Sequence, residues 1–118
     1  MNGTFSNPSS RTLKENFVRV DTQSVLARFM ELPINEWTYK RDVERRRHVG
    51  PTAEDFQQAF GLGTDGKYIF PIDVQGITMA AVQGLKLEND ALKAENTEVK
   101  ARLARIEALL LGSPPVSE

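Results

Sequence analysis

A serine and a lysine near the start of the chain, Ser9 and Lys14, have the side chains that a small nucleophilic site needs. A serine hydroxyl is a poor nucleophile until a neighbouring group removes its proton, and a lysine amine does so once burial or a nearby cation lowers its pKa. Such a site needs only these two groups and donors for the oxyanion, and a target in the same chain adds a high effective concentration. The spacing alone is not specific, because both residue types are common.

The size of the chain limits its architecture. Its 118 residues and 13.2 kDa fit one domain at most, and the C-terminal third has the pattern of a single helix. We therefore expect a small head whose stability depends on association with other copies. A net charge of -1 and a pI near 5.9 argue against general nucleic-acid or membrane-surface binding. Without cysteine, an export signal or a long apolar window, we expect a soluble chain.

Two short helices are predicted in the first half of the chain, each marked by its end signals. Asp21 has the side chain to cap the first helix, and Leu32-Pro33 ends it. Thr52 begins the second helix in a pattern like a capping box, and Gly61 stops that helix in a left-handed conformation. The first helix has four apolar residues on one face: Val25, Leu26, Phe29 and Met30.

A β-hairpin is predicted between these helices. Residues 36–40 alternate polar and aromatic side chains, and residues 46–49 follow after a short polar connection. The lone His48 cannot form a metal site in a chain without cysteine, so we interpret it as a buried hydrogen-bonding residue. Four aromatic residues of the head are expected in the core: Trp37, Tyr39, Phe56 and Phe60.

A basic run over residues 40–48 precedes the C-terminal helix, and this order raises the alternative of a basic-zipper protein bound to DNA. Such proteins need one continuous helix from the basic region into the zipper. Breakers interrupt the chain at Gly50-Pro51, Gly61 and Pro71, so we expect no nucleic-acid partner. The arginines are interpreted as a solvated hairpin face or as partners for acids of a neighbouring subunit.

The C-terminal helix has a heptad pattern, in which apolar residues recur at alternating spacings of three and four. With Val82 at position a, the g and following e positions are oppositely charged in three pairs: Glu88 with Lys93, Glu95 with Lys100, and Arg102 with Glu107. Pairs of this kind join helices that are parallel and in register, so the sequence predicts a parallel homo-oligomer. The seam consists of Val82, Leu85, Asn89, Leu92, Asn96, Val99, Leu103, Ile106 and Leu110. The alternative is a helix that packs on its own head.

Two features of this helix refine the prediction. Asn89 and Asn96 occupy a positions, where a polar residue lowers stability but penalises slipped or antiparallel arrangements. One such asparagine often favours dimers, which leaves dimer and trimer both open on the residues alone. Before the seam, four small residues predict close packing against the helix: Gly76, Ala80, Ala81 and Gly84.

Several segments in a fixed order carry a resemblance to a known family. They are SSRTLKENF (9–17), ELPINEWTYK (31–40), HVGP (48–51), FGLG (60–63) and the closing helix. Together, over about residues 9–110, the chain resembles the C-terminal intramolecular chaperone domain of phage endosialidases, tail spikes and tail fibres. The resemblance implies a homotrimer that guides folding of the β-rich fibre or spike preceding it. Many members then release themselves through a Ser-Lys dyad.

For this chain the resemblance implies that Ser9 is the nucleophile at the cleavage site and Lys14 its general base, with the scissile bond adjoining Ser9. The family signature is approximately Ser-Asp-x-x-x-Lys, and here Ser10 replaces the aspartate. Two alternatives therefore remain: a self-cleaving domain, and a permanent trimerisation or tip domain that never cleaves. Only eight residues precede Ser9, so either Met1 begins an excised piece of a longer protein or the domain is made separately.

The expected fold is α+β, with a small globular head of short helices and a β-hairpin before a long helix in a parallel, trimeric coiled coil. We expect an irregular leader at 1–10, the head at 11–72, the long helix at 73–111 and a flexible tail at 112–118. No cofactor, metal or membrane partner is expected. The resemblance implies assembly in the host cytoplasm, and a place in the virion tail fibre if the domain is retained.

Overall fold

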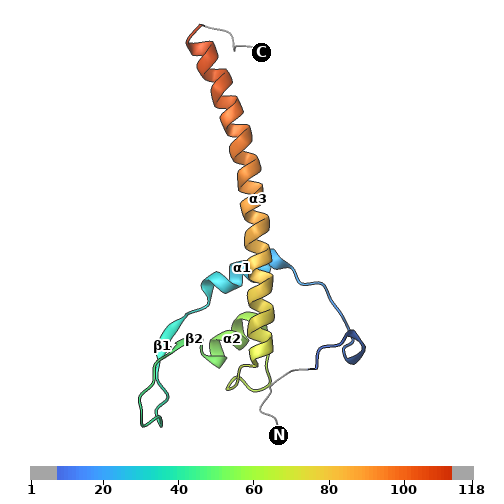
Figure 1. The fold of residues 1–118 in the computed structure, drawn as a ribbon, viewed down its shortest axis with the longest axis vertical. Helices are drawn as coiled ribbons and strands as arrows, with labels where there is room; N and C mark the ends of the chain where they lie inside the picture. The colour runs from blue at the N-terminus through green and yellow to red at the C-terminus, as the bar shows by residue number, and fades with distance from the viewer. Residues whose placement is uncertain (1–7, 113–118) are drawn as a thin grey trace.

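The computed structural model describes residues 8–112, so most of the expected leader and tail lies outside the described residues. A small head surrounds the lower part of one long helix, and the molecule measures 76 × 41 × 30 Å (Figure 1). Figure 1 also shows the described residues before α1 extending away from the head as an arm. The elements in chain order are the 3-10 helix η1 (Arg11–Leu13), α1 (Thr22–Glu31), β1 (Asn35–Trp37), β2 (His48–Gly50), α2 (Ala53–Phe60) and α3 (Pro71–Leu110).

The predicted helix signals are confirmed at both short helices. The Asp21 carboxylate accepts hydrogen bonds from the N–H groups of Gln23 and Ser24 at 3.1 and 3.2 Å, which caps α1. Thr52 Oγ1 accepts from the Asp55 N–H at 3.1 Å at the start of α2. Gly61, with φ of 66°, ends α2 in the left-handed region that glycine adopts without a steric penalty.

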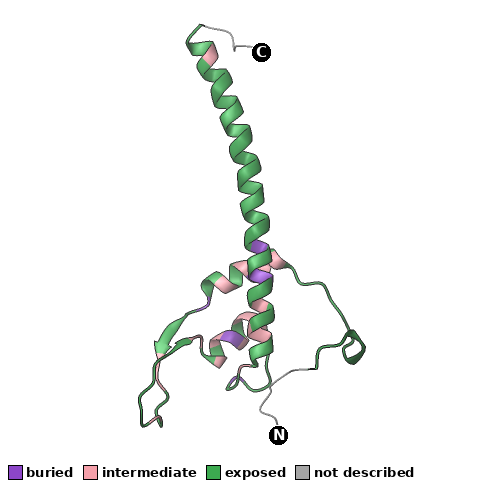
Figure 2. Cartoon of the chain, in the orientation of Figure 1, coloured by how far each residue is buried: buried purple, intermediate pink, exposed green. Residues whose placement is uncertain are grey.

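The core lies where α1 crosses α3. Val25 of α1 and Ala80 and Ala81 of α3 are buried there, and Figure 2 shows that burial on α3 is confined to this crossing. The residues packed around them are Leu26, Phe29, Phe60 and Ile77. Met30, which was predicted on the same face of α1, is 75% exposed because the helix ends one residue later and turns away.

Gly84 explains how α1 and α3 approach so closely. A Cβ atom added at Gly84 would lie 2.5 Å from the backbone oxygen of Thr22, so only glycine fits at the observed separation. Gln23 Nε2 also donates a 2.9 Å hydrogen bond to the Gly84 carbonyl. The prediction of close packing is confirmed for Ala80, Ala81 and Gly84, whereas Gly76 is exposed with no atom within 4 Å of such a Cβ.

The predicted hairpin is confirmed, with shorter strands than expected. β1 and β2 are antiparallel and pair Asn35 with Gly50, Glu36 with Val49 and Trp37 with His48. The chain leaves the ladder after Trp37 because the connection is held by its own side chains. The Asp42 carboxylate accepts from the Arg46 backbone N–H at 3.0 Å and from the Arg46 guanidinium at 3.1 and 3.2 Å. These hydrogen bonds lower the pKa of Asp42.

Two predictions for the hairpin residues are wrong. Tyr39 is exposed instead of lying in the core, and His48 is exposed instead of buried. The reason is that, among the described helices and strands, β1 and β2 contact only each other, so no helix covers these two side chains. Trp37 stacks on His48 with ring centroids 4.9 Å apart and meets Tyr39 edge-on at 4.8 Å. Trp37 itself is half-buried and donates to the Gly50 carbonyl at 3.2 Å.

α3 begins at Pro71, earlier than the predicted start at residue 73. A proline fits the first helical position because its fixed φ suits the helix and its missing N–H would have had no partner there. At about 1.5 Å per residue, the 40 residues of α3 span roughly 60 Å, which accounts for most of the length of the molecule. No described helix is long and apolar enough to cross a membrane.

Candidate functional site

Ser9 and Lys14 are in direct contact at the far end of the arm. Lys14 Nζ lies 2.7 Å from Ser9 Oγ and donates a hydrogen bond to it. This distance falls within the reach required of a nucleophile and its general base. A lysine amine can take the proton of a serine hydroxyl at this distance only in its neutral form.

A single 3-10 turn creates this contact. Ser10 is the N-cap of η1: its Oγ accepts from the Thr12 N–H at 3.3 Å and lies 2.9 Å from Thr12 Oγ1. The Leu13 N–H then donates to the Ser10 carbonyl at 3.0 Å, which closes the turn and brings Lys14 back toward Ser9. The residue that departs from the family signature therefore caps the turn that joins the dyad.

Sequence reasoning missed this capping role, although a signal was present. Serine and aspartate are near-equivalent N-cap residues because each offers a side-chain oxygen to the free N–H groups of the first turn. Ser10 followed by a short helix-compatible stretch was a sufficient cue. Asn16 was also missed: it adopts a φ of 61°, in the left-handed region that asparagine tolerates better than most residues, and it redirects the chain after Lys14.

The arm that carries the dyad is open to solvent. Every residue from Pro8 to Val20 is exposed, including Ser9 and Lys14 (Figure 2). Among the described residues, η1 packs against no other helix or strand. The clearest internal contact of the arm besides the dyad places the Arg11 guanidinium 5.4 Å from the centre of the Phe17 ring.

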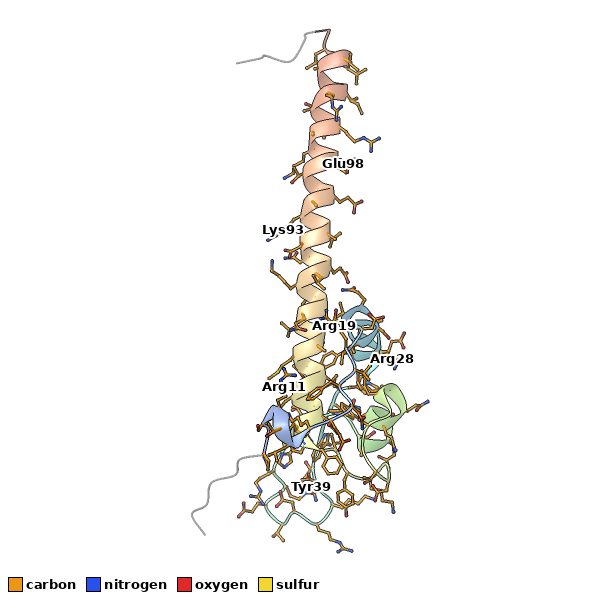
Figure 3. All side chains as sticks on the ribbon, turned by 90° about the vertical axis from the view of Figure 1, so that its right-hand side faces the viewer. Arg11, Arg19, Arg28, Tyr39, Lys93 and Glu98 are labelled. Carbon is orange, nitrogen blue, oxygen red and sulfur yellow. The ribbon has the colours of Figure 1, made fainter. Side chains whose placement is uncertain are left out.

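The heptad seam of α3 is the second candidate site. α1 covers one face of α3, and the predicted a and d positions lie on a different face, where they are about half exposed or more. A groove along this face is lined by Val82, Leu85, Lys86, Glu88, Asn89 and Leu92. Figure 3 shows Lys93 and Glu98 projecting from α3 above the head. The apolar stripe is therefore accessible to another helix along most of its length.

A comparison with protein families identifies a match for the N-terminal half of the chain. The family model described as chaperone of endosialidase matches residues 9–62. The resemblance inferred from the sequence is thus confirmed for this segment. The match begins at Ser9 and includes the dyad, α1, the hairpin and α2, whereas α3 lies beyond it. No curated protein matches the chain.

The charged residues of the matched segment contact mainly nearby atoms of the same chain. Within residues 8–112, no group of three or more His, Asp or Glu side chains could hold a metal ion. The basic run of the hairpin is largely engaged with nearby atoms of the same hairpin. Arg46 pairs with Asp42, Arg47 lies 3.8 Å from Glu36, and Arg45 Nη1 donates to the carbonyls of Tyr39 and Lys40 at 3.2 Å.

Proposed function

We propose that this chain is a C-terminal intramolecular chaperone of a phage-type tail fibre or spike, which assembles as a parallel homotrimer and releases itself by cleavage at Ser9. The observation that carries the proposal is the 2.7 Å contact between Ser9 and Lys14 at the first residues of the matched segment. The description of the matched family supports the chaperone role, and the exposed seam of α3 supports the association.

The chemistry of release balances within the chain and one water molecule. Neutral Lys14 accepts the hydroxyl proton of Ser9, and Ser9 Oγ forms a bond to the carbonyl carbon of Pro8. The C–N bond between Pro8 and Ser9 then breaks, and the proton passes to the new amino group of Ser9. Water hydrolyses the ester, which frees the carboxylate of Pro8 and restores the Ser9 hydroxyl. One turnover separates the fibre from its chaperone.

Ser10 favours retained cleavage. The absence of the usual aspartate argued for a silent relative, but Ser10 caps η1 and so supplies the local support that an N-cap aspartate would give. The geometry of the dyad therefore does not depend on the missing carboxylate. The second candidate function, a permanent trimeric cap on the fibre, keeps the same assembly without the chemistry. It is favoured by the full exposure of the dyad in the single chain.

Assembly would give the chaperone its template. The g and e charges of α3 favour parallel helices in register, and the family resemblance supports three of them, so the chains that enter the head would be aligned with one another. Aligned starting points lower the entropy that the upstream β-rich segments must lose before they pair with one another. Removal of the chaperone then makes unfolding slow, because the folded fibre no longer has the template for the reverse path.

The test is the intact mass of the domain expressed behind a β-rich upstream segment. We expect the parent to be cut next to Ser9, and Ser9→Ala and Lys14→Ala to remain whole. Lys14→Arg is the matched control, because arginine keeps the charge and the hydrogen bond to Ser9 but does not act as a base. If the parent stays whole while sedimenting as a trimer, the permanent-cap function replaces self-release.

A further inference from the structure

The arm carries more apolar side chains than a fully exposed segment needs. Four of its apolar side chains lie in solvent, with exposed fractions of 67% for Leu13, 62% for Phe17, 85% for Val18 and 53% for Val20. Single exposed apolar residues are ordinary, but four within eight positions of one exposed segment concentrate apolar surface in the arm. Such a surface loses its contact with water only if another surface covers it.

The Ser9–Lys14 dyad also requires a surface that shields it from water. A lysine acts as a base only in its neutral form, which removal from water favours, and the oxyanion needs donors held ready for it. Within the described arm, the N–H groups of Leu13 and Lys14 already donate to the carbonyls of Ser10 and Arg11. The arm thus brings the nucleophile and the base together but leaves both exposed, so a second surface is needed to enclose them.

A groove beside the seam of α3 has the properties of that surface. Its α3 wall consists of Val82, Gln83, Lys86 and Leu87, and its other wall is the root of the arm at residues 19–22. Val82 and Lys86 also line the groove along the seam, so the two surfaces are continuous. Leu87 is 57% exposed at heptad position f, which points away from the axis of a coiled coil. Neither α1 nor pairing along the seam accounts for an apolar residue there.

The occupant that fits this groove is the arm of a second copy. In a parallel assembly a neighbouring helix stands along the seam, and therefore beside this groove. Each arm starts at the wall of its own groove and leads away from its own α3 (Figure 1). If each arm binds the groove of the next copy, the same contact occurs once per copy around the symmetry axis. The contacts then form a closed ring.

We propose that the arm docks in trans: residues 13–18 of one copy bind the groove around Leu87 of its neighbour, and this contact completes the Ser9–Lys14 site. The inference rests on the proposed self-release. It adds that Ser9 and Lys14 come from one copy and their enclosing surface from another. Cleavage then requires assembly, because a lone chain presents its dyad to water.

Complementation between two chains tests the proposal. One chain carries Leu87→Glu with an intact dyad, and the other carries Ser9→Ala with an intact groove; each has an upstream segment of distinct mass. Alone, the Leu87→Glu chain should be cut at least about tenfold more slowly than the parent. A tenfold change in rate corresponds to about 1.36 kcal/mol in the activation free energy. Co-expressed in equal amounts, about half of its arms should meet an intact groove on the next copy and be cut.

Different cleavage results are expected if the arm binds a surface other than the neighbour's groove. If the arm docks on its own chain, the Leu87→Glu chain stays whole in the mixture, and docking in trans is overturned. If the upstream fibre covers the arm, Leu87→Glu is cut as fast as the parent, with the same consequence. Val43→Glu is the matched control, because Val43 is 93% exposed at the hairpin tip outside the groove and its substitution should leave cleavage unchanged. Sedimentation must show that the Leu87→Glu chain still assembles.

If the parent is never cut, self-release is rejected. Cross-linking still tests the docking of the arm in that case. The chain has no cysteine, so Leu13→Cys in one tagged copy and Leu87→Cys in another are the only thiols present. A short bismaleimide should join them into a product with the summed mass of the two copies. A chain carrying both substitutions, diluted into an excess of cysteine-free chain, should give little internal product. Efficient internal cross-linking there overturns docking in trans.

Discussion

The two faces of α3 differ in the size of their residues and in what covers them. Where α1 crosses, the residues are small, and Ala80, Ala81 and Gly84 are buried within the single chain. Along the seam the residues are large and apolar, and Leu85 and Leu92 are 57% and 56% exposed. Small residues thus mark the contact that the chain completes by itself, and large exposed residues mark the contact we assign to other copies. The two faces of this one helix therefore differ by side-chain volume.

The strongest way to break this comparison is to place a charge in the seam. Leu92→Asp at position d should abolish assembly, because an unpaired charge in a closed helical interface costs roughly 3–5 kcal/mol. Sedimentation velocity should then show a single chain whose helical circular dichroism is partly lost. The helices beyond the head have little other support, since α3 above α1 is exposed in the single chain (Figure 2).

The control for that change is Ala94→Asp, two residues away at the outward position f. It adds the same charge without entering the seam, so the assembly should be retained. Assembly of Leu92→Asp to the same extent as the parent would show that the exposed stripe is not the interface, and the two faces of α3 would then lose their distinct roles.

The face of α3 that α1 covers is tested by adding one methyl group at Gly84. Gly84→Ala should destabilise the head by about 1–3 kcal/mol, the usual cost of overpacking a close contact. The new Cβ would lie 2.5 Å from the Thr22 oxygen and 3.3 Å from Leu26 Cβ, so α1 must move and the bond from Gln23 to the Gly84 carbonyl would lengthen. Urea unfolding followed by circular dichroism, at fixed chain concentration, measures the change.

Gly76→Ala is the matched substitution on the same helix. No atom lies within 4 Å of its Cβ position, so it should raise stability by up to about 1 kcal/mol through helix propensity. Opposite signs for the two glycines would confirm that α1 packs as described. Equal effects would mean that the close approach at Gly84 does not hold in solution, and a loss at Gly76 would reveal a contact with another copy there.

Local signals allowed much of the fold to be predicted from the sequence. Asp21, Thr52 and Gly61 act within four residues of themselves, so their capping roles follow from residue type and spacing alone. The heptad pattern predicted a long helix because it repeats over several turns. These elements are confirmed because nothing distant in the chain has to agree with them.

Burial was harder to predict, since it depends on what lies opposite a residue. Tyr39 and His48 have the pattern of a half-buried strand, but this head offers no layer to cover them. The contact between Ser9 and Lys14 was anticipated from the resemblance, whereas the turn that produces it was not. A comparison of Ser10 with the family signature predicts the loss of a carboxylate, whereas its N-cap role depends on the backbone of the turn that follows.

The smallest expected effect concerns charge along the seam, and it sharpens the distinction between the two faces. Lys100→Glu would set like charges at the g and e positions opposite Glu95, which should weaken a parallel assembly by about 0.5 kcal/mol per pair. The double variant Glu95→Lys with Lys100→Glu restores opposite signs and should regain the lost stability. High salt should reduce the difference, because screening weakens exposed pairs. If the double variant were as weak as the single one, the pairing would not be parallel and in register, and the exposed face of α3 would have to bind its partner in another arrangement.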